Sequence, residues 1–308
     1  MQFSFDINAF LAKLDEYTEK KIKYTRDCPM STLTTFKIGG PCAAAVFPDN
    51  ASELAYAAEC AYELGVLPKI IGRGSNLLCS DDGYDGIVIV SDNADAIKIN
   101  GELVECECGA SLTAAANEAH EASLAGAEFM YGIPGTIGGG VFMNAGAYGG
   151  QMSDVVVRVE CLNVKTKERF SLSCDELDFS YRHSAFTSRR DHIVLGAALK
   201  LRQGNKEEIG ARMRDFITRR REKQPLEYPS AGSTFKRCEG RFTAQLIDEA
   251  GLKGMRVGNA AVSEKHAGFI INLGGASACD VLSLVDKVKA EIYKKYGLNI
   301  ECEVEYLG

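Results

Sequence analysis

The sequence predicts an α+β fold. Segments with helical spacing and segments with strand-like alternation both occur along the 308 residues, and they follow one another without a strict strand–helix–strand rhythm. A polar break at residues 205–206 separates two such sets. Because a chain of this length exceeds one small domain, we expect two main regions with a boundary near residue 204.

The first region opens with apolar residues at helical spacing, which predict a helix over about 6–20. The extended segment 34–46 precedes a second helix, over about 52–64, for which Ser52 is the expected N-cap. An alanine-rich stretch predicts a third helix over 111–125. Strands are predicted at 68–71, 86–90, 96–99, 103–108, 155–164, 168–172 and 192–201.

The second region begins with a charged helix over about 207–223. Further helices are predicted over 243–250 and 277–296, and strands near 257–262 and 268–272. A final strand is expected over 299–307. Glu301, Glu303 and Glu305 would share one face of that strand, because side chains alternate with a period of two, so spacing alone does not choose among them.

Composition limits the classes of function and the location of the protein. The net charge of -7 at pH 7 argues against a general nucleic-acid binder, whose phosphate contacts need a basic surface. The eleven cysteines are scattered without a Cys-x-x-Cys spacing, so we expect reduced, mostly buried thiols and no metal site. No apolar run approaches about eighteen residues, which predicts a cytoplasmic protein without a membrane span. The oligomeric state stays open.

The stretch 132–149 says most about function, because it has seven glycines in eighteen positions. Glycine lets backbone amides approach a ligand closely, and successive exposed amides bind the oxygens of a diphosphate. A linker or a structural turn is the alternative. Ile137, Val141 and Phe142 within the stretch need burial, which favours a cofactor-binding loop over a flexible linker.

A second candidate loop, residues 72–78, follows the strand predicted at 68–71. Its sequence begins like the dinucleotide fingerprint Gly-x-Gly-x-x-Gly, but the last glycine is replaced by Leu77. A Rossmann fold is therefore not expected. A structural turn is one interpretation of this loop. Its pairing with the later glycine-rich stretch favours another dinucleotide-binding fold.

The ordered set of motifs, from about Thr34 to the C-terminus, resembles the UDP-N-acetylenolpyruvoylglucosamine reductase (MurB) family. The resemblance implies the FAD-binding fold of the vanillyl-alcohol-oxidase/PCMH type in two lobes, about 1–85 and 86–204. It also implies a C-terminal α/β substrate-binding domain over 205–298 and a terminal strand, 299–308, that carries a catalytic glutamate. The expected cofactors are FAD and NADPH, in an enzyme of peptidoglycan precursor synthesis.

The resemblance also implies which residues meet the cofactor. NADPH would reduce FAD, and the reduced flavin would pass hydride to the enolpyruvyl group of a UDP-sugar to give UDP-N-acetylmuramate. By motif match, the residues expected to contact FAD are Gly72, Arg73, Gly74, Ser75, Asn76, Leu77, Gly132, Ile133, Pro134, Gly135, Thr136, Gly138, Gly139, Asn144 and Gly146.

Three residues are expected to act on the substrate. Without the resemblance, Arg182 would be interpreted as a surface or salt-bridging residue, and Ser233 as a turn or cap residue. The family's Tyr-Arg-x-Ser, Gly-Ser and terminal Glu-Val motifs give them roles. Arg182 would bind the enolpyruvyl carboxylate, because a guanidinium suits a carboxylate. Ser233 would donate the proton, and Glu303 would assist its delivery.

The basic run at 219–223 has two interpretations, a solvated helix face or a site for the substrate's diphosphate. Lys223 matches a substrate-binding lysine of the family, and Lys236 and Arg237 are further candidates for substrate binding. The segment 265–269, Lys-His-Ala-Gly-Phe, also matches the family, and we expect it to have a packing role.

One branch of the family inserts a loop with a tyrosine that closes over the substrate, and the interval from Arg182 to Ser233 leaves no room for it, which predicts the short type. The main alternative function is an FAD-dependent oxidase of the same fold, which would not need Ser233, Lys223 and Glu303 together. A non-catalytic nucleotide-binding module is the second alternative.

Overall fold

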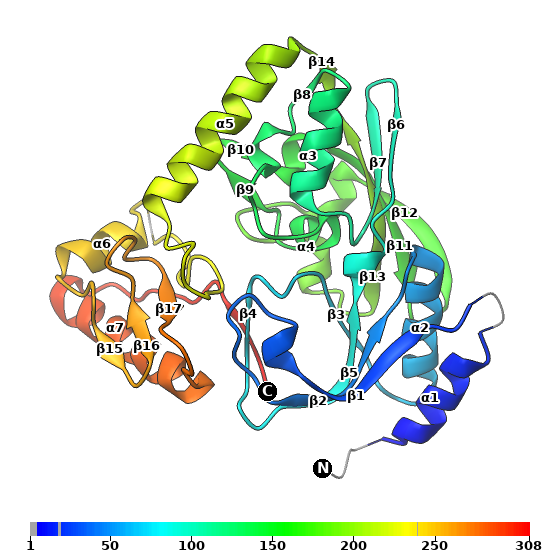
Figure 1. The fold of residues 1–308 in the computed structure, drawn as a ribbon, viewed down its shortest axis with the longest axis horizontal. Helices are drawn as coiled ribbons and strands as arrows, with labels where there is room; N and C mark the ends of the chain where they lie inside the picture. Colours follow the sequence, from blue (N-terminus) through cyan, green and yellow to red (C-terminus); the bar gives the residue numbers. More distant parts are fainter. Residues whose placement is uncertain (1–4, 18–19, 239) are drawn as a thin grey trace. The chain divides into compact units, whose positions relative to one another are not determined.

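The computed structural model describes residues 5–17, 20–238 and 240–308 (Figure 1). The chain divides into two compact units. Unit 1 comprises Met1–Asp27, Ala43–Arg73 and Gly86–Thr218, and unit 2 comprises Cys28–Cys42, Gly74–Asp85 and Arg219–Gly308. Each unit has its own buried apolar core. These units describe packing, so the domain boundaries expected near residues 204 and 298 stay a prediction.

Helices and strands are mixed along the chain, as the sequence predicts for an α+β fold. The helices are α1 (Ile7–Asp15), α2 (Ala51–Glu63), α3 (Leu112–Glu121), α4 (Ile137–Phe142), α5 (Lys206–Lys223), α6 (Thr243–Glu249) and α7 (Ala278–Tyr296). The strands are β1 (Lys23–Pro29), β2 (Pro41–Phe47), β3 (Lys69–Ile71), β4 (Leu77–Cys79), β5 (Tyr84–Val90), β6 (Ile97–Asn100), β7 (Leu103–Glu107), β8 (Leu124–Ala125), β9 (Gly146–Ala147), β10 (Gly150–Gln151), β11 (Val156–Asn163), β12 (Glu168–Ser173), β13 (His192–Lys200), β14 (Arg202–Gln203), β15 (Arg256–Val257), β16 (Ala260–Val262), β17 (Ile270–Asn272) and β18 (Glu305–Leu307).

Two sheets supply most of the strands of unit 1. The five-stranded sheet has the order β12-β11-β13-β7-β6, and every neighbouring pair in it is antiparallel. The four-stranded sheet has the order β1-β2-β5-β3, in which β3 and β5 run parallel. Helices α2 and α4 pack against β13, while α3 packs against β6 and β7. The central strand β13 is therefore buried along most of its length, whereas the edge strand β12 is mostly exposed.

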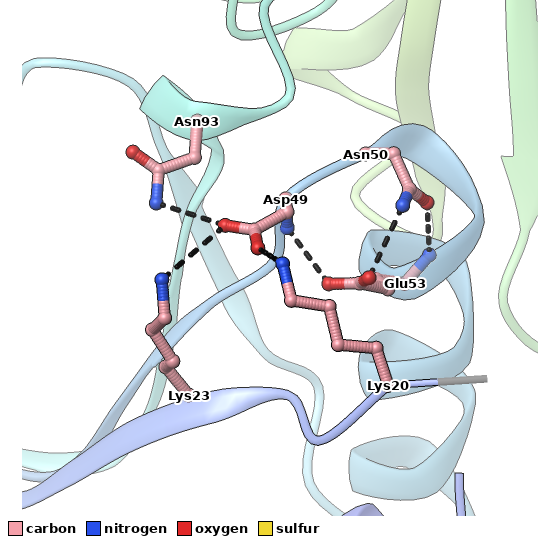
Figure 2. Close-up of polar contacts among 6 residues, drawn as sticks. All are labelled: Lys20, Lys23, Asp49, Asn50, Glu53 and Asn93. Carbon is pink, nitrogen blue, oxygen red and sulfur yellow. Dashed lines mark hydrogen bonds and ion pairs between the residues drawn. The ribbon is translucent and has the colours of Figure 1, made fainter. Parts of the chain in front are cut away.

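The start of α2 corrects one prediction from the sequence. Its N-cap is Asn50 and not Ser52: the Asn50 side-chain oxygen accepts hydrogen bonds from the amides of Ser52 and Glu53, at 3.0 and 2.9 Å. Asparagine and serine cap helices about equally well, so local preference could not choose between two candidates two residues apart. The buried Glu53 favours Asn50 as the N-cap, because the Glu53 carboxylate accepts a hydrogen bond from the Asn50 side chain at 3.1 Å (Figure 2).

A cluster of polar side chains surrounds this helix start (Figure 2). The Asp49 amide donates to Glu53 at 2.8 Å, and the Asp49 carboxylate pairs with Lys20 and, at 3.9 Å, with Lys23. The Asn93 side chain donates to the same carboxylate at 3.4 Å. The hydrogen bond from Lys20 lowers the pKa of Asp49. The cluster joins the segment that follows α1 to the start of α2.

Unit 2 is organised around α7. This helix packs against β15 and β16 of the three-stranded antiparallel sheet β15-β16-β17, and α6 packs against α7. Helix α7 begins where the sequence predicts, with a capping box made by Ser277 and Asp280, and Gly297 ends it in the left-handed conformation, with φ 68°. Strand β18 pairs in parallel with β4.

Several expected elements have different limits in the structure. Helix α1 ends at Asp15, and residues 18 and 19 of the predicted helix lie outside the described residues. The strand expected over 34–46 begins only at Pro41, because Lys37 (φ 56°) and Gly39 (φ 129°) turn the chain before it. The strand expected over 299–307 is reduced to β18 after a bend at Val304. Strands β1 and β4 were not predicted from the sequence.

Within the part of the chain that the structure describes, no helix is both long enough and apolar enough to cross a lipid bilayer.

An ion pair between an exposed arginine and a buried glutamate fixes the first part of α5 within unit 1. The Arg212 guanidinium donates two hydrogen bonds to Glu128, at 3.1 and 2.6 Å, and the Gly126 amide donates a third at 2.8 Å. Glu128 is only 8% exposed. Burial alone would raise the pKa of Glu128, but the hydrogen bonds from Arg212 and from backbone amides outweigh burial and lower it. The aromatic rings of Phe216, on the same helix, and Tyr148 stack at 4.6 Å.

We expect Glu128→Gln to lower the free energy of unfolding at pH 7 by about 1–3 kcal/mol, because Arg212 loses its ionic partner. The pKa of Glu128 is depressed in the folded protein. Its contribution is therefore present above the ordinary glutamate pKa and is lost as the pH falls through the folded value, so wild type and variant converge in acid. Urea unfolding between pH 7 and pH 3 measures this.

The control for this experiment is Glu102→Gln, which removes a carboxylate from an exposed pair with Lys200 at 2.9 Å. Exposed pairs contribute little, so this variant should unfold almost as the wild type does. Equal losses in the two variants would contradict the role given to Glu128.

Candidate active site

The two glycine-rich loops meet in unit 1. Thr136 is the N-cap of α4: its hydroxyl accepts a hydrogen bond from the Gly139 amide at 3.3 Å, and the residue is 1% exposed. A side chain at position 72 would clash with the Thr136 hydroxyl, so glycine is required there for the loops to touch. The burial expected within the later loop is observed for Ile137 and Val141, which are fully buried, whereas Phe142 is half-buried.

The amides of the later loop are mostly engaged inside the protein, which differs from the row of exposed amides expected from the sequence. The donors and their acceptors are Gly132 to Thr113, Ile133 to Met130, Gly135 to Ile133, Ile137 to Ala110, Gly138 to Cys108 and Gly140 to Thr136. The loop uses these amides to pack against the start of α3 and the end of β7. Gly139 is exposed, and a Cβ there would meet only the Thr136 hydroxyl, at 3.5 Å.

Unit 2 contributes the rest of the first loop, residues 74–77, and a hydroxyl that fits a polar ligand. Gly74 has φ 57°, and a side chain there would clash with the Leu33 carbonyl. Beside it, Thr34 is 7% exposed, and its hydroxyl has no hydrogen-bond partner among the described residues. An unpaired buried hydroxyl costs about 1–3 kcal/mol. A bound group with phosphate oxygens would remove that cost, so these residues fit a dinucleotide cofactor.

Two predicted cofactor residues also make protein contacts of their own. Arg73 is exposed, and its guanidinium pairs with Asp92 at 3.0 Å. The Asn76 side chain donates to the Glu303 carbonyl at 3.0 Å, and the Asn76 carbonyl accepts from the Glu305 amide at 2.9 Å. Asn76 therefore ties the first loop to the C-terminal segment within unit 2.

Ser233 and Glu303 lie on neighbouring extended segments of unit 2. Phe235 and Cys302 form an antiparallel bridge, and the Glu303 amide donates to the Thr234 carbonyl at 2.8 Å. Register then sets Thr234 opposite Glu303 and Ser233 one residue further along. Ser233 is half-buried, and its hydroxyl makes no hydrogen bond to any residue that the structure describes.

The segment 265–269 supports this arrangement from the other side, which confirms its expected packing role. The Thr234 amide donates to the Gly268 carbonyl at 2.8 Å, and the Thr234 hydroxyl accepts from the Ile270 amide at 3.1 Å. His266 packs edge-to-face on Phe269 at 4.8 Å and accepts a hydrogen bond from the Gly268 amide. Burial lowers the pKa of His266, so the ring stays neutral near pH 7.

Arg182 lies in a two-residue turn of unit 1. The backbones of Ser180 and His183 exchange two hydrogen bonds of 3.2 Å, which leaves Tyr181 and Arg182 at the tip. Arg182 has φ 55°, a left-handed conformation that is costly for an arginine. Its guanidinium lies over the Tyr181 ring at 5.4 Å.

Two buried side chains hold this turn on the end of α4. Asn144, 3% exposed, donates through Nδ2 to the Ser180 carbonyl at 3.1 Å and accepts from the Ser153 amide at 3.0 Å. The Ser184 hydroxyl donates to the Phe142 carbonyl at 2.7 Å. The cofactor contact expected for Asn144 stays a prediction, because both ends of its amide group serve the protein. Gly146, also expected near the cofactor, begins β9.

The candidate substrate-binding residues lie in unit 2 with different surroundings. Lys223 is exposed at the C-terminal end of α5. Lys236 is engaged with Glu301 at 3.0 Å, and the Arg237 guanidinium lies over the exposed Phe242 ring at 4.9 Å. Within the basic run at 219–223, Arg220 is only 8% exposed, so the run is not a fully solvated helix face. Neither the Phe242 contact nor the burial of Arg220 has a signal in the sequence.

The predicted site residues thus fall into two groups. Unit 1 brings together Gly72, the later loop and the Arg182 turn, while unit 2 brings together residues 74–77, Ser233 and Glu303.

Comparison with known proteins first defines the class of protein. Residues 41–168 match the family model described as an FAD binding domain, which is the class that the two loops and the mixed α/β fold indicate. Residues 224–307 match the model of the C-terminal domain of UDP-N-acetylenolpyruvoylglucosamine reductase.

The relatives are similar over almost the whole chain. The UDP-N-acetylenolpyruvoylglucosamine reductase of Caldicellulosiruptor saccharolyticus is 44% identical over 96% of this chain and 96% of its own, and that of Pediococcus pentosaceus is 46% identical over 91% and 93%. The crystal structure of the Thermus caldophilus reductase (MurB) superposes with a TM-score of 0.79, at 34% identity, covering 93% of this chain and 99% of the other. The chain belongs to the UDP-N-acetylenolpyruvoylglucosamine reductase family.

The open space at Gly139 allows a direct test of the expected FAD contact. Gly139→Ala should leave the apoprotein's melting temperature unchanged or slightly raised, because alanine favours the helix and meets little protein. If the glycine faces FAD, the added methyl group should lower flavin affinity at least about tenfold. Flavin absorbance after gel filtration and thermal melts of apoprotein measure the two effects.

Gly138→Ala is the matched control, because a methyl group there would lie 3.0 Å from Cys108 Cβ. That variant should lose thermal stability and flavin together. Normal flavin affinity in Gly139→Ala would remove Gly139 from the cofactor site.

Proposed function

We propose that this protein reduces the enolpyruvyl group of UDP-N-acetylglucosamine enolpyruvate to give UDP-N-acetylmuramate, a step of peptidoglycan precursor synthesis. It is an oxidoreductase that uses FAD and NADPH. The observation that carries the proposal is the pairing of the Ser233 segment with the Glu303 segment, in a chain that is 44% identical to such a reductase over 96% of its length. FAD, when bound, carries hydride from NADPH to the substrate.

Arg182 is the residue that we assign to the substrate's carboxylate. A guanidinium is permanently charged and offers paired donors that match the two oxygens of a carboxylate. Hydride addition to the methylene carbon builds negative charge on the adjacent carbon and its carboxylate, and a fixed cation lowers the energy of that charge. The left-handed backbone of Arg182 supports this role, because strain of this kind persists where function requires it.

Ser233 and Glu303 are assigned to proton delivery. Reduction ends when the carbon next to the carboxylate takes a proton, and a hydroxyl can supply it only with neighbours that stabilise the alkoxide left behind. The Ser233 hydroxyl is not used in hydrogen bonds to the described residues, so it is available for this purpose. Glu303, whose amide is anchored to Thr234, would assist that delivery from the adjoining segment.

The remaining assignments follow the same division of the chain. We assign residues 1–204 to FAD binding, in lobes of about 1–85 and 86–204, residues 205–298 to the substrate, and 299–308 to the strand with Glu303. The FAD contacts are the two loops with Gly146; the side chain of Asn144 is engaged with Ser180 and Ser153, so Asn144 is not included among them. Lys223, Lys236 and Arg237 are assigned to the substrate; Lys236 would have to leave Glu301 to reach it.

Two finer properties belong to the proposal. The chain is of the short type without the tyrosine loop, which is supported by the regular elements β13, β14 and α5 that fill most of the interval between Arg182 and Ser233. It acts in the cytoplasm, where thiols stay reduced. Burial raises the pKa of Cys42, Cys106, Cys108 and Cys161 to about 12, which keeps these thiols protonated and unreactive.

The flavin spectrum tests the proposed function. We expect absorption bands that bleach when NADPH is added without oxygen and that return when the enolpyruvyl UDP-sugar is added, because each addition completes one half of the reaction. Anaerobic spectrophotometry measures both. Bleaching that only dioxygen reverses would favour the oxidase instead. A colourless protein that FAD cannot reconstitute would contradict the cofactor and the reaction together.

Ser233→Ala tests the proton donor. Reduction of the flavin by NADPH should keep its wild-type rate, while reoxidation by the substrate should slow by about 10²–10⁴-fold, because only the second step needs the proton. Stopped-flow absorbance separates the two. Ser171→Ala, which removes an exposed hydroxyl on β12, is the control and should change neither rate. Reoxidation of Ser233→Ala at the wild-type rate would show that another group is the acid.

A further inference from the structure

The turn that carries Arg182 depends on two hydrogen bonds to the end of α4. One runs from the Asn144 side chain to the Ser180 carbonyl at 3.1 Å, and the other runs from the Ser184 hydroxyl to the Phe142 carbonyl at 2.7 Å. Their partners on the turn, Ser180 and Ser184, lie two residues before and two residues after Arg182. The backbone that carries Arg182 is thus held from both sides.

Asn144 is suited to this work by its own position. It is 3% exposed, and the Ser153 amide donates to its side-chain oxygen at 3.0 Å, so the amide group is held at both ends and cannot rotate freely. Its backbone has φ 42°, a conformation that asparagine tolerates better than most residues. A larger or non-polar side chain would leave the Ser180 carbonyl and the Ser153 amide unpaired in a buried place.

We propose that Asn144 is a positioning residue that holds Arg182 for the substrate-reducing half of the reaction. The proposal rests on the function proposed above, in which Arg182 binds the substrate's carboxylate. The same helix α4 begins at the Thr136 N-cap, where the two glycine loops meet, so Asn144 connects the cofactor-binding loop to the turn that presents the arginine. Reduction of the flavin by NADPH does not involve the carboxylate, so it should not depend on Asn144.

Two substitutions separate this role from a general structural one. Asn144→Gly removes the side chain but suits the positive φ, so the backbone of the turn after α4 is retained. Asn144→Asp keeps the oxygen that accepts from Ser153 and removes the donor to Ser180. In both variants, loaded with FAD, flavin reduction by NADPH should stay within about threefold of wild type. Reoxidation by the enolpyruvyl UDP-sugar should slow about 10- to 100-fold, the effect of displacing a group by about 1 Å.

The matched control is Asn163→Asp. Asn163 also uses its side-chain oxygen to accept backbone amides, those of Lys165 and Thr166, and its nitrogen contacts His192 at 3.4 Å. Asn163 lies at the end of β11, and none of these three hydrogen bonds reaches the turn that carries Arg182. Both half-reactions should keep their wild-type rates in this variant.

Arg182→Lys and the double variant Arg182→Lys with Asn144→Gly complete the test. If Asn144 acts through Arg182, reoxidation in the double variant should be little slower than in Arg182→Lys alone. Additive losses would overturn the positioning role, as would equal slowing of both half-reactions in Asn144→Gly. Normal reoxidation in Asn144→Gly and Asn144→Asp, with slow reoxidation in Arg182→Lys, would overturn the role of Asn144 alone. Normal reoxidation in Arg182→Lys would instead contradict the assignment of Arg182.

Discussion

The burial of Thr136 against Gly72 is the constraint on which the arrangement of unit 1 depends. The threonine hydroxyl caps α4, and only a glycine at position 72 allows the first loop to approach it. Helix α4 then packs against the central strand β13, and its C-terminal end supports the turn that carries Arg182. A short helix of six residues thereby joins the candidate cofactor loop to a candidate catalytic residue.

Unit 2 uses a second buried threonine in a comparable way. Thr234 forms hydrogen bonds through its amide, carbonyl and hydroxyl to Gly268, Glu303 and Ile270 respectively. These contacts fix the backbone immediately after Ser233 without using the serine hydroxyl. In both units, residues next to the candidate catalytic groups hold the backbone that carries these groups. A backbone fixed in this way preorganises the attached side chains, which is what catalysis by positioned groups requires.

The sequence predicted the parts of the fold that are encoded locally. The helix that begins at Ser277, the strand that leads into the first loop and the burial of Ile137 and Val141 all follow from neighbouring residues, and the structure confirms them. One error occurred where a partner far along the chain decides, because strand β4 exists only through its pairing with β18. The cap of α2 is a different kind of error: Asn50 and Ser52 are both good cap residues, and the contact of Asn50 with Glu53, three residues on, distinguishes them in the structure.

The sequence by itself determined the class of the protein and the identity of the motifs, because glycine spacing and the Tyr-Arg, Gly-Ser and Glu-Val pairs are properties of the chain. Tertiary structure alone decided how these residues are used. The loop amides expected to face a ligand mostly donate within the protein, and Asn144, expected to meet the cofactor, directs its side chain to Ser180 and Ser153. The physical reason is that a buried polar group must find a partner, and the choice of partner depends on which segments packing brings beside it.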